Sequence, residues 1–478
     1  MSSNHIQRQR KFLQLTFQDY YIENADLVDI PAKLHNREFG MQLFSLTWRC
    51  DRKIIESDSG EQKEVGCGRS GTSYARILKC PFCDSKQLQI TDWVRHLGFR
   101  TRDALLHELV QSAPHSVYHS AALYETPVAR FMHEKNWRGA ELIFDIDADH
   151  LDSKCTERHD SWICNDADCE ESGMGPPPSD ECPSCKGKSF SSRKWVCDDC
   201  LQDAKDNTLK LYDVFLSEDF GIDPEKIVLN YSGHRGYHVR VQDSKIFSLD
   251  SSARTEIVHY IEGTGFTTAS FRSTVEQDDY KNPLVVISEK VPLPTSAVEK
   301  LSVPGWANRV SQAMVEFISD IDSYHGSERW VKVLKENKQE AIHGLKRTPP
   351  ILSPRVKGIG DKFWQEISIR AVQSYGASID GPVTYDLKRV IRLIGSINGK
   401  TGFKVNRLNR EEIDSFNPFV DAIAFRGGTL KVHTLGGLVK IPAFKIDAEE
   451  YGPYGDEIVE LPKPAALFLL CKGVANLE

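Results

Sequence analysis

The chain has 478 residues, a formal net charge of −8 and ordinary numbers of glycine (32) and proline (22), which exclude a collagen-like or mainly disordered protein. At about 150 residues per domain, this length predicts two to four units, and no apolar run reaches the roughly 20 residues of a membrane span. The N-terminus lacks the apolar segment of a secretory signal, so the 12 cysteines indicate metal ligands in preference to disulfides.

The net acidity, taken alone, argues against a nucleic-acid partner, but the charge is unevenly distributed. Residues 145–181 hold 12 acids and two basic residues, residues 446–478 hold seven and two, and residues 343–410 hold four acids and 13 basic residues. Such blocks can be ordinary solvated faces. They also fit an acidic metal site and a basic, polyanion-binding face that are separated along the chain.

Strand and helix patterns alternate along the sequence. Apolar runs predict buried strands at residues 142–147 and 227–231, and an alternating pattern predicts a half-buried strand at residues 237–241. Apolar positions at helical spacing in residues 304–324, together with residues 251–263, predict a helical subdomain. The fold class is therefore mixed α/β.

This pattern predicts an α/β catalytic body that is interrupted by a helical subdomain and by zinc-binding insertions. A proline-rich segment at residues 347–354 is the expected linker back to the body. The expected division is residues 1–250 for the first part of the body, with insertions at 48–90 and 155–200, residues 251–345 for the helical subdomain, and residues 346–478 for the second part of the body.

Eleven of the cysteines fall into three groups with the spacing of zinc ligands. The stretch around Cys164 is acidic and has too few apolar residues to form a core, so it needs a metal to stabilise it. Closed four-ligand sites are structural, so catalysis is expected elsewhere. Taken alone, His159 would be an ordinary surface histidine, and Cys471, in an apolar run, is a predicted buried thiol. The predicted zinc sets are Cys164, Cys169, Cys182 and Cys185; Cys155, His159, Cys197 and Cys200; and Cys50, Cys67, Cys80 and Cys83, where only the last pair is closely spaced.

Two aspartates carry the first indication of chemistry. Asp145 and Asp147 are two positions apart on a predicted strand, so their carboxylates share one face while Phe144 and Ile146 enter the core. Neighbouring like charges are unfavourable without a cation between them, which implies a hard divalent ion. A calcium-binding loop is excluded by His150, where such a loop needs glycine. Surface acids at a strand end remain the simpler alternative.

A second motif, Ser-Gly-His-Arg-Gly-Tyr-His at residues 232–238, joins two predicted strands. Its glycines allow the backbone to approach a ligand, and its Ser, Arg and His side chains can donate to phosphate oxygens. A tight hairpin would need the glycines but would not need Arg235 and His238.

A third acid, Asp380, precedes a cluster of basic and amide residues, Lys388, Arg389, Arg392, Asn398 and Lys400. The basic residues could line a solvated helix face or bind polyphosphate. Residues 395–401 nearly match a P-loop, but Ile394 stands where its first glycine should be, so a P-loop ATPase is rejected. Three acids, a phosphate-binding loop and a basic face together indicate two-metal nucleotidyl transfer.

With these motifs in place, the chain resembles the catalytic (small) subunit of archaeal–eukaryotic replicative DNA primase, most closely the archaeal form. The resemblance covers about residues 35–425 and depends on the order and spacing of separate motifs. These are Arg37-Glu38-Phe39-Gly40, Ser116-Val117-Tyr118-His119-Ser120-Ala121, residues 141–147, residues 232–238, Ile379-Asp380 and residues 388–402.

The resemblance implies roles for individual residues. Asp145, Asp147 and Asp380 match the family's catalytic metal-binding triad, and the set that includes Cys155 and His159 matches its zinc knuckle, which makes residues 164–185 an inserted module. Asn398 stands where the family usually has histidine, and it can donate a hydrogen bond but cannot carry charge. The implied nucleotide-binding residues are Ser232, Gly233, Arg235, His238, Arg392, Asn398, Lys400, Arg37 and Glu38.

The function implied is templated synthesis of short RNA primers, with DNA primers as a variant, on single-stranded DNA during replication. The enzyme would be a nucleotidyltransferase with two Mg²⁺ or Mn²⁺ ions and one to three structural Zn²⁺ ions. Its expected partners are nucleoside triphosphates, the DNA template and a large primase subunit that carries an iron–sulfur cluster. We expect a cytoplasmic, nucleoid-associated protein if the source is archaeal and a nuclear one if it is eukaryotic.

Two alternatives remain open at this point. One is a repair polymerase or primase-polymerase of the same superfamily. The other is a non-catalytic zinc-module protein that binds nucleic acid, although such a protein has no need of three convergent acids.

Overall fold

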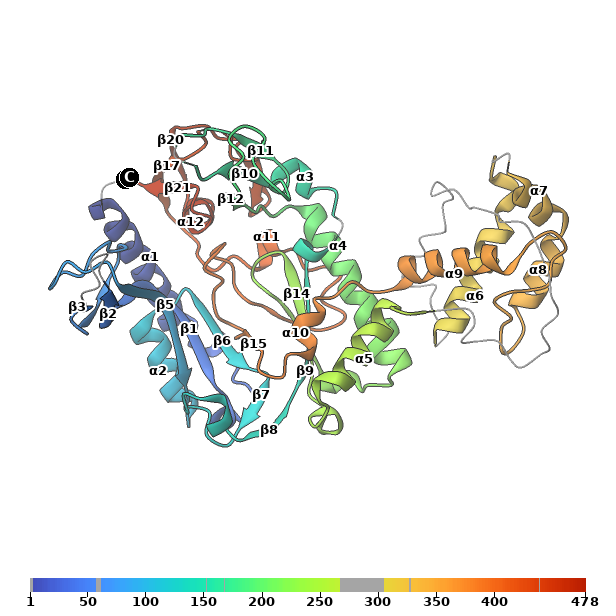
Figure 1. The fold of residues 1–478 in the computed structure, drawn as a ribbon, viewed down its shortest axis with the longest axis horizontal. Coiled ribbons are helices and arrows are strands. Elements are labelled where there is room, and N and C mark those ends of the chain that lie inside the picture. The colour runs from blue at the N-terminus through green and yellow to red at the C-terminus, as the bar shows by residue number, and fades with distance from the viewer. Residues whose placement is uncertain are drawn as a thin grey trace.

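The computed structural model describes residues 3–56, 62–151, 153–166, 168–266, 305–325, 328–437 and 439–478. Helices and strands are mixed throughout, which confirms the predicted fold class. Two sheets face each other across the middle of the body, and a helical lobe stands apart from them at one end (Figure 1). Within the described residues, no helix is both long enough and apolar enough to cross a membrane.

The first sheet has five strands in the order β15-β6-β1-β4, with β5 also paired to β1. Helices α1 (Ser3–Glu23) and α2 (Arg102–Ser112) pack together, and α1 also packs on β1. Helix α2 begins at Thr101, whose hydroxyl accepts from the Ala104 N–H, an ordinary N-cap. The strands are β1 (Phe39–Cys50), β4 (Ser70–Ser73), β5 (Leu88–Leu97), β6 (Ser116–Ser120) and β15 (Val390–Arg392).

The second sheet has four strands in the order β16-β13-β14-β9. All three strands predicted from apolar patterns are present in it: β9 (Leu142–Asp147), β13 (Ile227–Tyr231) and β14 (Gly236–Val241), joined by the short β16 (Arg407–Leu408). Helix α4 (Asp198–Leu209), which continues as the π-helix η5 (Lys210–Asp219), packs on β9 and β14. Helices α10 (Gly381–Tyr385) and α5 (Ser251–Glu262) lie beside β9 (Figure 1).

The helical lobe contains α6 (Trp306–Ser319), α7 (Arg329–Glu336), α8 (Lys338–Leu345) and α9 (Asp361–Tyr375). The apolar stripe predicted for residues 304–324 is buried, from Val310 to Ile321, although Pro304 lies outside the described residues. The helix ends at Ser319 and a 3-10 turn, η10 (Ile321–Ser323), follows. Helix α9 packs on α6, so the lobe extends past the predicted linker, whereas α5 packs on α10 in the body.

The C-terminal segment forms a small sheet beside residues 161–193, where the Arg193 side chain donates to the Leu435 and Val439 carbonyls (Figure 1). Strands β17 (Thr429–Thr434), β20 (Ile458–Pro462) and β21 (Ala475–Leu477) pair, and α12 (Lys463–Cys471) packs against them. Burial raises the pKa of the Cys471 thiol to about 12.

The remaining elements are β2 (Lys53–Glu56), β3 (Gln62–Val65), β7 (Ala122–Tyr124), β8 (Trp137–Ala140), α3 (Thr156–His159), β10 (Ser161–Cys164), β11 (Ser172–Met174), β12 (Phe190–Arg193), α11 (Pro418–Asp421), β18 (Phe444–Ile446) and β19 (Glu449–Tyr451), with short 3-10 turns between them.

Candidate active site and metal centres

The carboxylates of the predicted triad meet at β9. The Asp145 and Asp147 side chains are 26% and 25% exposed, while Phe144 and Ile146 are buried on the opposite face, as strand alternation predicts. Asp380 comes from the segment just before α10, and its backbone N–H donates to the Asp145 carbonyl at 2.9 Å. The structure therefore brings together three acids that are far apart in the sequence.

Their mutual repulsion affects the pKa of Asp145. Burial, together with the charges of Asp147 and Asp380, raises this pKa to about 7, against the opposite effect of Arg389 and Arg392. A divalent cation among these groups would relieve the repulsion, so the donor set fits Mg²⁺ or Mn²⁺. Within the described part of the chain, the groups whose ligand atoms all lie within 4.8 Å are cysteine-based, so the triad oxygens stand further apart than that.

The loop at residues 232–235 is positioned by the pairing of β14 with β9. In this antiparallel pair, His238 lies opposite Asp145 and Gly236 lies opposite Asp147. A Cβ atom on Gly236 would lie 1.9 Å from the Ile146 carbonyl oxygen, so only glycine permits this close approach. The predicted phosphate-binding loop consequently ends directly beside the carboxylates.

A second loop, at residues 395–402, supports the first. The Asn398 side chain donates to the Ser232 carbonyl at 3.0 Å, and the Thr401 hydroxyl donates to the Gly233 carbonyl at 2.5 Å. The segment then turns back in a bridge between Ile397 and Lys404 and does not enter a helix, which agrees with the rejection of a P-loop. Asn398 is buried, and its hydrogen bond to the Ser232 carbonyl stabilises the Ser232 loop.

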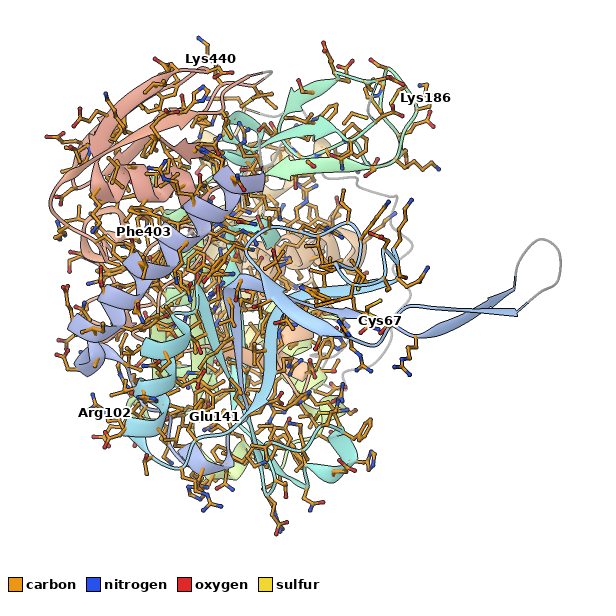
Figure 2. The ribbon with its side chains drawn as sticks, turned by 90° about the vertical axis from the view of Figure 1, so that its left-hand side faces the viewer. Cys67, Arg102, Glu141, Lys186, Phe403 and Lys440 are labelled. Atoms are coloured by element: carbon orange, nitrogen blue, oxygen red, sulfur yellow. The ribbon has the colours of Figure 1, made fainter. Side chains whose placement is uncertain are left out.

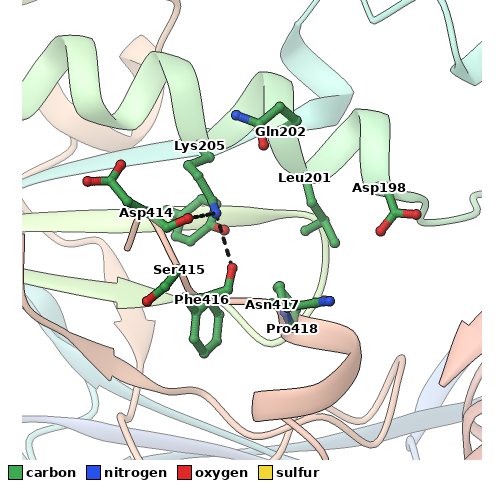
Figure 3. A pocket seen from close by; sticks show the side chains of 10 residues that line it. Asp198, Leu201, Gln202, Lys205, Asp414, Ser415, Phe416, Asn417 and Pro418 are labelled. Carbon is green, nitrogen blue, oxygen red and sulfur yellow. Dashed lines mark hydrogen bonds between the residues drawn. The ribbon is translucent and has the colours of Figure 1, made fainter. Parts of the chain in front are cut away.

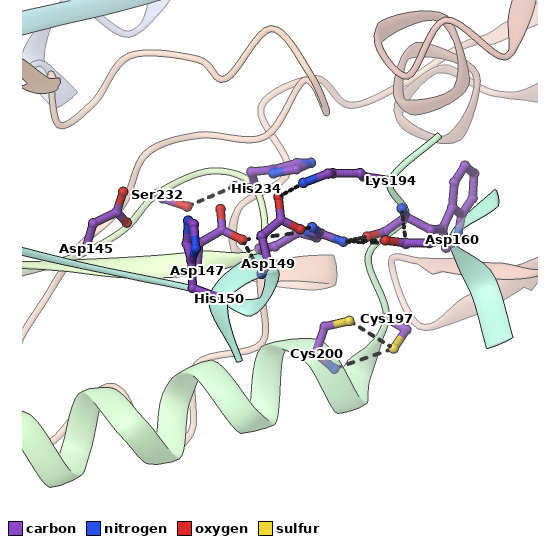
Figure 4. Close-up of polar contacts among 12 residues, drawn as sticks. Asp145, Asp147, Asp149, His150, Asp160, Lys194, Cys197, Cys200, Ser232 and His234 are labelled. Carbon is purple, nitrogen blue, oxygen red and sulfur yellow. Dashed lines mark hydrogen bonds and ion pairs between the residues drawn. The ribbon is translucent and has the colours of Figure 1, made fainter. Parts of the chain in front are cut away.

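Arg235 lies at the centre of an ion-pair network with Asp147, Asp149 and Asp160, three carboxylates that Figure 4 labels. Its side chain is fully buried; it pairs with Asp149 and lies 3.3 Å from an Asp160 oxygen and 3.7 Å from an Asp147 oxygen. It also donates to the Trp195 carbonyl at 3.0 Å. The network therefore holds the Arg235 guanidinium next to Asp147, which belongs to the triad and lies opposite Gly236 at the end of the loop.

Lys472, at the end of α12, extends the cationic side of the site. Its Nζ lies 2.9 Å from His234 Nε2 and donates to the Lys194 carbonyl at 3.1 Å. Burial, followed by the charges of Arg235 and Lys400, lowers the pKa of Lys472 to about 7. Lys194 itself pairs with Asp149 at 2.5 Å. The C-terminal segment thus contributes a basic side chain beside the Ser232 loop, and at its lowered pKa this amine is only partly protonated near neutral pH.

His238 and Arg392 complete the surroundings of the triad. Burial and the charges of Arg392 and Arg240 lower the pKa of His238 to about 3, so the imidazole is neutral, with Nε2 at 3.5 Å from Asp145 Oδ1. The Arg392 guanidinium lies over the Tyr118 ring at 4.8 Å from its centroid. Lys400, at the tip of the second loop, is exposed.

Arg37 and Glu38 differ from the other predicted nucleotide-binding residues because both are 1% exposed and fully engaged within the protein. Both residues directly precede β1, and the ion pair between Arg37 and Glu141 joins the first sheet to the segment before β9. A direct contact with nucleotide stays a prediction for both. Their partners are Glu141 and the Ser120 and Ala121 carbonyls for Arg37, and Lys135, Arg95 and His96 for Glu38.

All 12 cysteines are free, and the three predicted ligand sets are each gathered, with ligand atoms within 4.8 Å of one another. Sulfurs bound tetrahedrally at ~2.3 Å from zinc would be about 3.8 Å apart. The donor sets therefore fit zinc. The observed Sγ–Sγ distances are 3.7 Å for Cys50–Cys83, 3.6 Å for Cys67–Cys80, 3.5 Å for Cys164–Cys185, 3.8 Å for Cys169–Cys182, 3.0 Å for Cys155–Cys200 and 3.7 Å for Cys197–Cys200.

Asp160 connects one of these sets to the Ser232 loop. Its Oδ1 faces His159 Nδ1 at 2.8 Å and accepts from the Trp195 N–H at 2.8 Å, while the same carboxylate pairs with Arg235. The other nitrogen, His159 Nε2, lies 3.1 Å from Cys200 Sγ, within the ligand set. A carboxylate that orients a metal-binding histidine is a common feature of zinc sites. Here it also holds Arg235 of the Ser232 loop.

A separate cavity of about 250 Å³ opens on the other face of β14 (Figure 3). Tyr237 lines it, whereas the neighbouring His238 points to the triad, as alternation along a strand requires. The Lys205 ammonium in this cavity is bound by the Asp414 and Phe416 carbonyls. None of the predicted site residues lines it, so it is distinct from the active-site candidate.

The sequence did not indicate Asp149, Asp160, Lys194, His234 or Lys472 as site residues. His234 lies inside the predicted motif, so its position in the loop was the available signal. Lys194 and Asp160 flank zinc ligands in sequence. Lys472 follows an apolar run and is 238 residues from His234, so no local pattern could have indicated it.

Comparison with known proteins gives one consistent result. A family model described as DNA primase small subunit matches residues 179–408. The DNA primase small subunit PriS of Methanosarcina barkeri is 30% identical over 494 residues, which cover 98% of this chain and 97% of that protein. That of Methanosarcina mazei is 32% identical over 405 residues (80% and 86%), and that of Nitrosopumilus maritimus is 26% identical over 473 residues (98% of each).

Metal analysis of the purified chain should give about three zinc ions per molecule, because three four-ligand sets are assembled. Cys182→Ser should lower the content by about one and leave the other two sites filled. A content of about one in the unmodified chain would contradict zinc at both inserted modules.

In the metal-free protein, the Asp145 carboxyl should take up a proton as the pH falls through about 7. A divalent cation binds the ionised form, so Mn²⁺ affinity should rise as the pH increases across this range. Titration followed by electron paramagnetic resonance measures it, with Asp145→Asn as the control that should remove the pH dependence. Equal affinity of the unmodified chain on both sides of pH 7 would contradict this prediction.

Proposed function

The chain belongs to the DNA primase small-subunit family, and we propose that it joins two nucleoside triphosphates on a single-stranded DNA template and extends the resulting dinucleotide into a primer. The observation that supports this most strongly is the convergence of Asp145, Asp147 and Asp380 beside the Ser232 loop. Binding alone does not need three mutually repelling acids, whereas two-metal phosphoryl transfer does.

In the proposed reaction, Asp145, Asp147 and Asp380 would hold two Mg²⁺ or Mn²⁺ ions, which would supply activation of a 3′-hydroxyl and charge stabilisation for a leaving pyrophosphate. The triphosphate would lie along the Ser232 loop, where Gly233 would allow the backbone to approach it. The cations around this loop then neutralise charge that develops on the phosphates. These are Arg235, Arg392 and Lys400, together with Lys472 in its protonated form.

The neutral state of His238 bears on its proposed role. With a pKa lowered to about 3, the imidazole can donate one hydrogen bond without adding charge next to Asp145. Asn230 lies 3.3 Å from its Nδ1, which fixes the ring orientation. We assign His238 to positioning the nucleotide. Arg37 and Glu38 would shape the site through their buried ion pairs.

The wider setting of the proposal follows the family. The primers would be RNA, with DNA as the variant, and synthesis would serve replication together with a large primase subunit that carries an iron–sulfur cluster. Zinc in the set that includes His159 would hold the knuckle beside the active site. Product size and sugar type would separate a primase from a repair polymerase of the same superfamily. The proposed location is with the DNA, in the nucleoid of an archaeal cell.

Asp145→Ala and Asp380→Ala should each lower dinucleotide synthesis by about a thousandfold or more, because each removes a ligand of the catalytic ions. Affinity for a single-stranded oligonucleotide should change little. Primer-synthesis assays on single-stranded DNA with labelled nucleotides measure the first effect, and fluorescence anisotropy measures the second. Asp103→Asn, at an exposed aspartate on α2, is the control that should leave both intact. Retained synthesis in either alanine variant would rule out the proposed mechanism.

Asp160→Asn should raise the KM for nucleoside triphosphate roughly tenfold, the size of a charged hydrogen bond, because Arg235 loses a partner that holds it in place. Zinc content should stay the same. Asp203→Asn is the matched control: this carboxylate also borders the knuckle but accepts from the Ser153 hydroxyl. Steady-state kinetics with parallel metal analysis test the pair, and an unchanged KM in Asp160→Asn would refute the coupling.

A further inference from the structure

The two inserted cysteine modules share one pattern of tryptophan, cysteine, glycine and proline positions. Each has a Trp-x-Cys strand, and each continues as Cys-x3-Gly-x8-Cys-Pro-x-Cys with identical spacing. The first module comprises residues 48–50 and 66–90, and the second comprises residues 162–164 and 168–192. They differ in the segment between their first two cysteines, which has 16 residues in the first module and four in the second. In the first module that segment carries the β2–β3 hairpin.

The structure repeats this correspondence contact by contact. In both modules the tryptophan lies opposite a glycine of the next strand, and a Cβ atom on that glycine would lie less than 3.0 Å from the indole ring. The turn after Cys-Pro-x-Cys has the same positive φ, 56° at Asp84 and 62° at Lys186. Equivalent backbone hydrogen bonds are Cys50 N to Arg69 O (2.8 Å) and Cys164 N to Glu171 O (2.9 Å), and Cys80 N to Ser85 O (2.9 Å) and Cys182 N to Gly187 O (2.8 Å).

The two modules carry opposite charge on this common scaffold. Residues 66–90 hold four basic residues and one acid, whereas the matching residues 168–192 hold two basic residues and five acids. Since the backbone and the cysteine cage are the same, the difference lies in the exposed side chains. Both modules protrude on the same side of the molecule, where Cys67 and Lys186 mark them (Figure 2).

The first module also exposes two apolar side chains at positions where the second module has polar residues, although the second module exposes Met174. Phe82 is 57% exposed and Leu78 is 81% exposed, and the Arg69 guanidinium lies over the Phe82 ring at 4.4 Å. At the positions of Arg69 and Phe82, the second module has a hydrogen-bonded pair, Ser184 donating to Glu171. Leu78 and Lys79 correspond to Asp180 and Glu181.

An exposed ring beside cations is the combination that binds single-stranded nucleic acid, because bases stack on the ring while basic side chains contact phosphates. We propose that the first module is a docking surface for the single-stranded DNA template and that the second module, although built on the same scaffold, is not. The inference rests on the proposed function, since it assigns a place to that reaction's template.

Strand β1 connects this surface to the active-site candidate. The strand runs from the Arg37–Glu38 segment to Cys50, a length of about 40 Å at ~3.3 Å per residue. At its inner end, the Trp93 ring passes over Gly40 and lies 5.0 Å from the Tyr118 ring, which in turn lies under Arg392. These three side chains are partly exposed on one face of the first sheet. A template held at Phe82 could follow this face to the triad.

The second module supplies the design of the test. Arg69→Glu combined with Phe82→Ser installs the pair that the same scaffold already carries at Glu171 and Ser184, so the fold should persist. Fluorescence anisotropy of the full chain with a labelled single-stranded oligonucleotide should show roughly ten- to a hundredfold weaker binding. The dependence of affinity on salt should become shallower by about one counterion. Zinc content and the KM for nucleoside triphosphate should not change.

The reciprocal double variant, Glu171→Arg with Ser184→Phe, is the matched control and should not weaken binding. Lys79→Glu, which copies Glu181, gives a second variant that should weaken binding if the first loses zinc. Unchanged DNA affinity and salt dependence in a first-module variant that retains its zinc would overturn the inference. A variant that lost binding to the large subunit but kept its affinity for single-stranded DNA would also overturn it. If the unmodified chain still bound single-stranded DNA and made primers, either result would leave the proposed function standing. An unmodified chain that bound no single-stranded DNA would overturn both this inference and the proposed function.

Discussion

The antiparallel pairing of β9 with β14 is the constraint on which the rest of the site depends. It sets Asp145 opposite His238 and Asp147 opposite Gly236, so two carboxylates and the Ser232 loop share one edge of the sheet. Because the strand period is two, a shift of one residue would turn both carboxylates into the core. The backbone contact from Asp380 to Asp145 and the braces from Asn398 and Thr401 then complete the arrangement.

Residue patterns within single segments correctly predicted the strands, the helix and the cysteine sets of this chain. The alternation around Asp145, the apolar run before Ser232 and the helical stripe after Pro304 each formed the expected element, because burial of one face selects the period. Cysteine spacing likewise predicted three ligand sets, all of which are gathered. The pattern shared by two sets was also present in the sequence, but the added hairpin displaces Cys50 from its partners and hides the common spacing.

What the sequence could not show are contacts between distant segments. Asp160 lies beside a zinc ligand, yet its position against Arg235 depends on how the segment that follows α3 folds against the Ser232 loop. Lys472 reaches His234 only because α12 folds back over the body. The same applies to Asn398: its residue type suggested a weaker phosphate ligand, whereas its burial gives it a bracing contact with the neighbouring loop.

The central claim, that three convergent acids form a two-metal site, is tested most directly by anomalous diffraction from crystals of the whole chain with Mn²⁺ and a non-hydrolysable nucleoside triphosphate. Data collected at the manganese and zinc edges distinguish the two metals. Two manganese peaks among Asp145, Asp147 and Asp380, with zinc confined to the cysteine sets, are expected. Manganese absent from the triad while nucleotide is bound would contradict the claim.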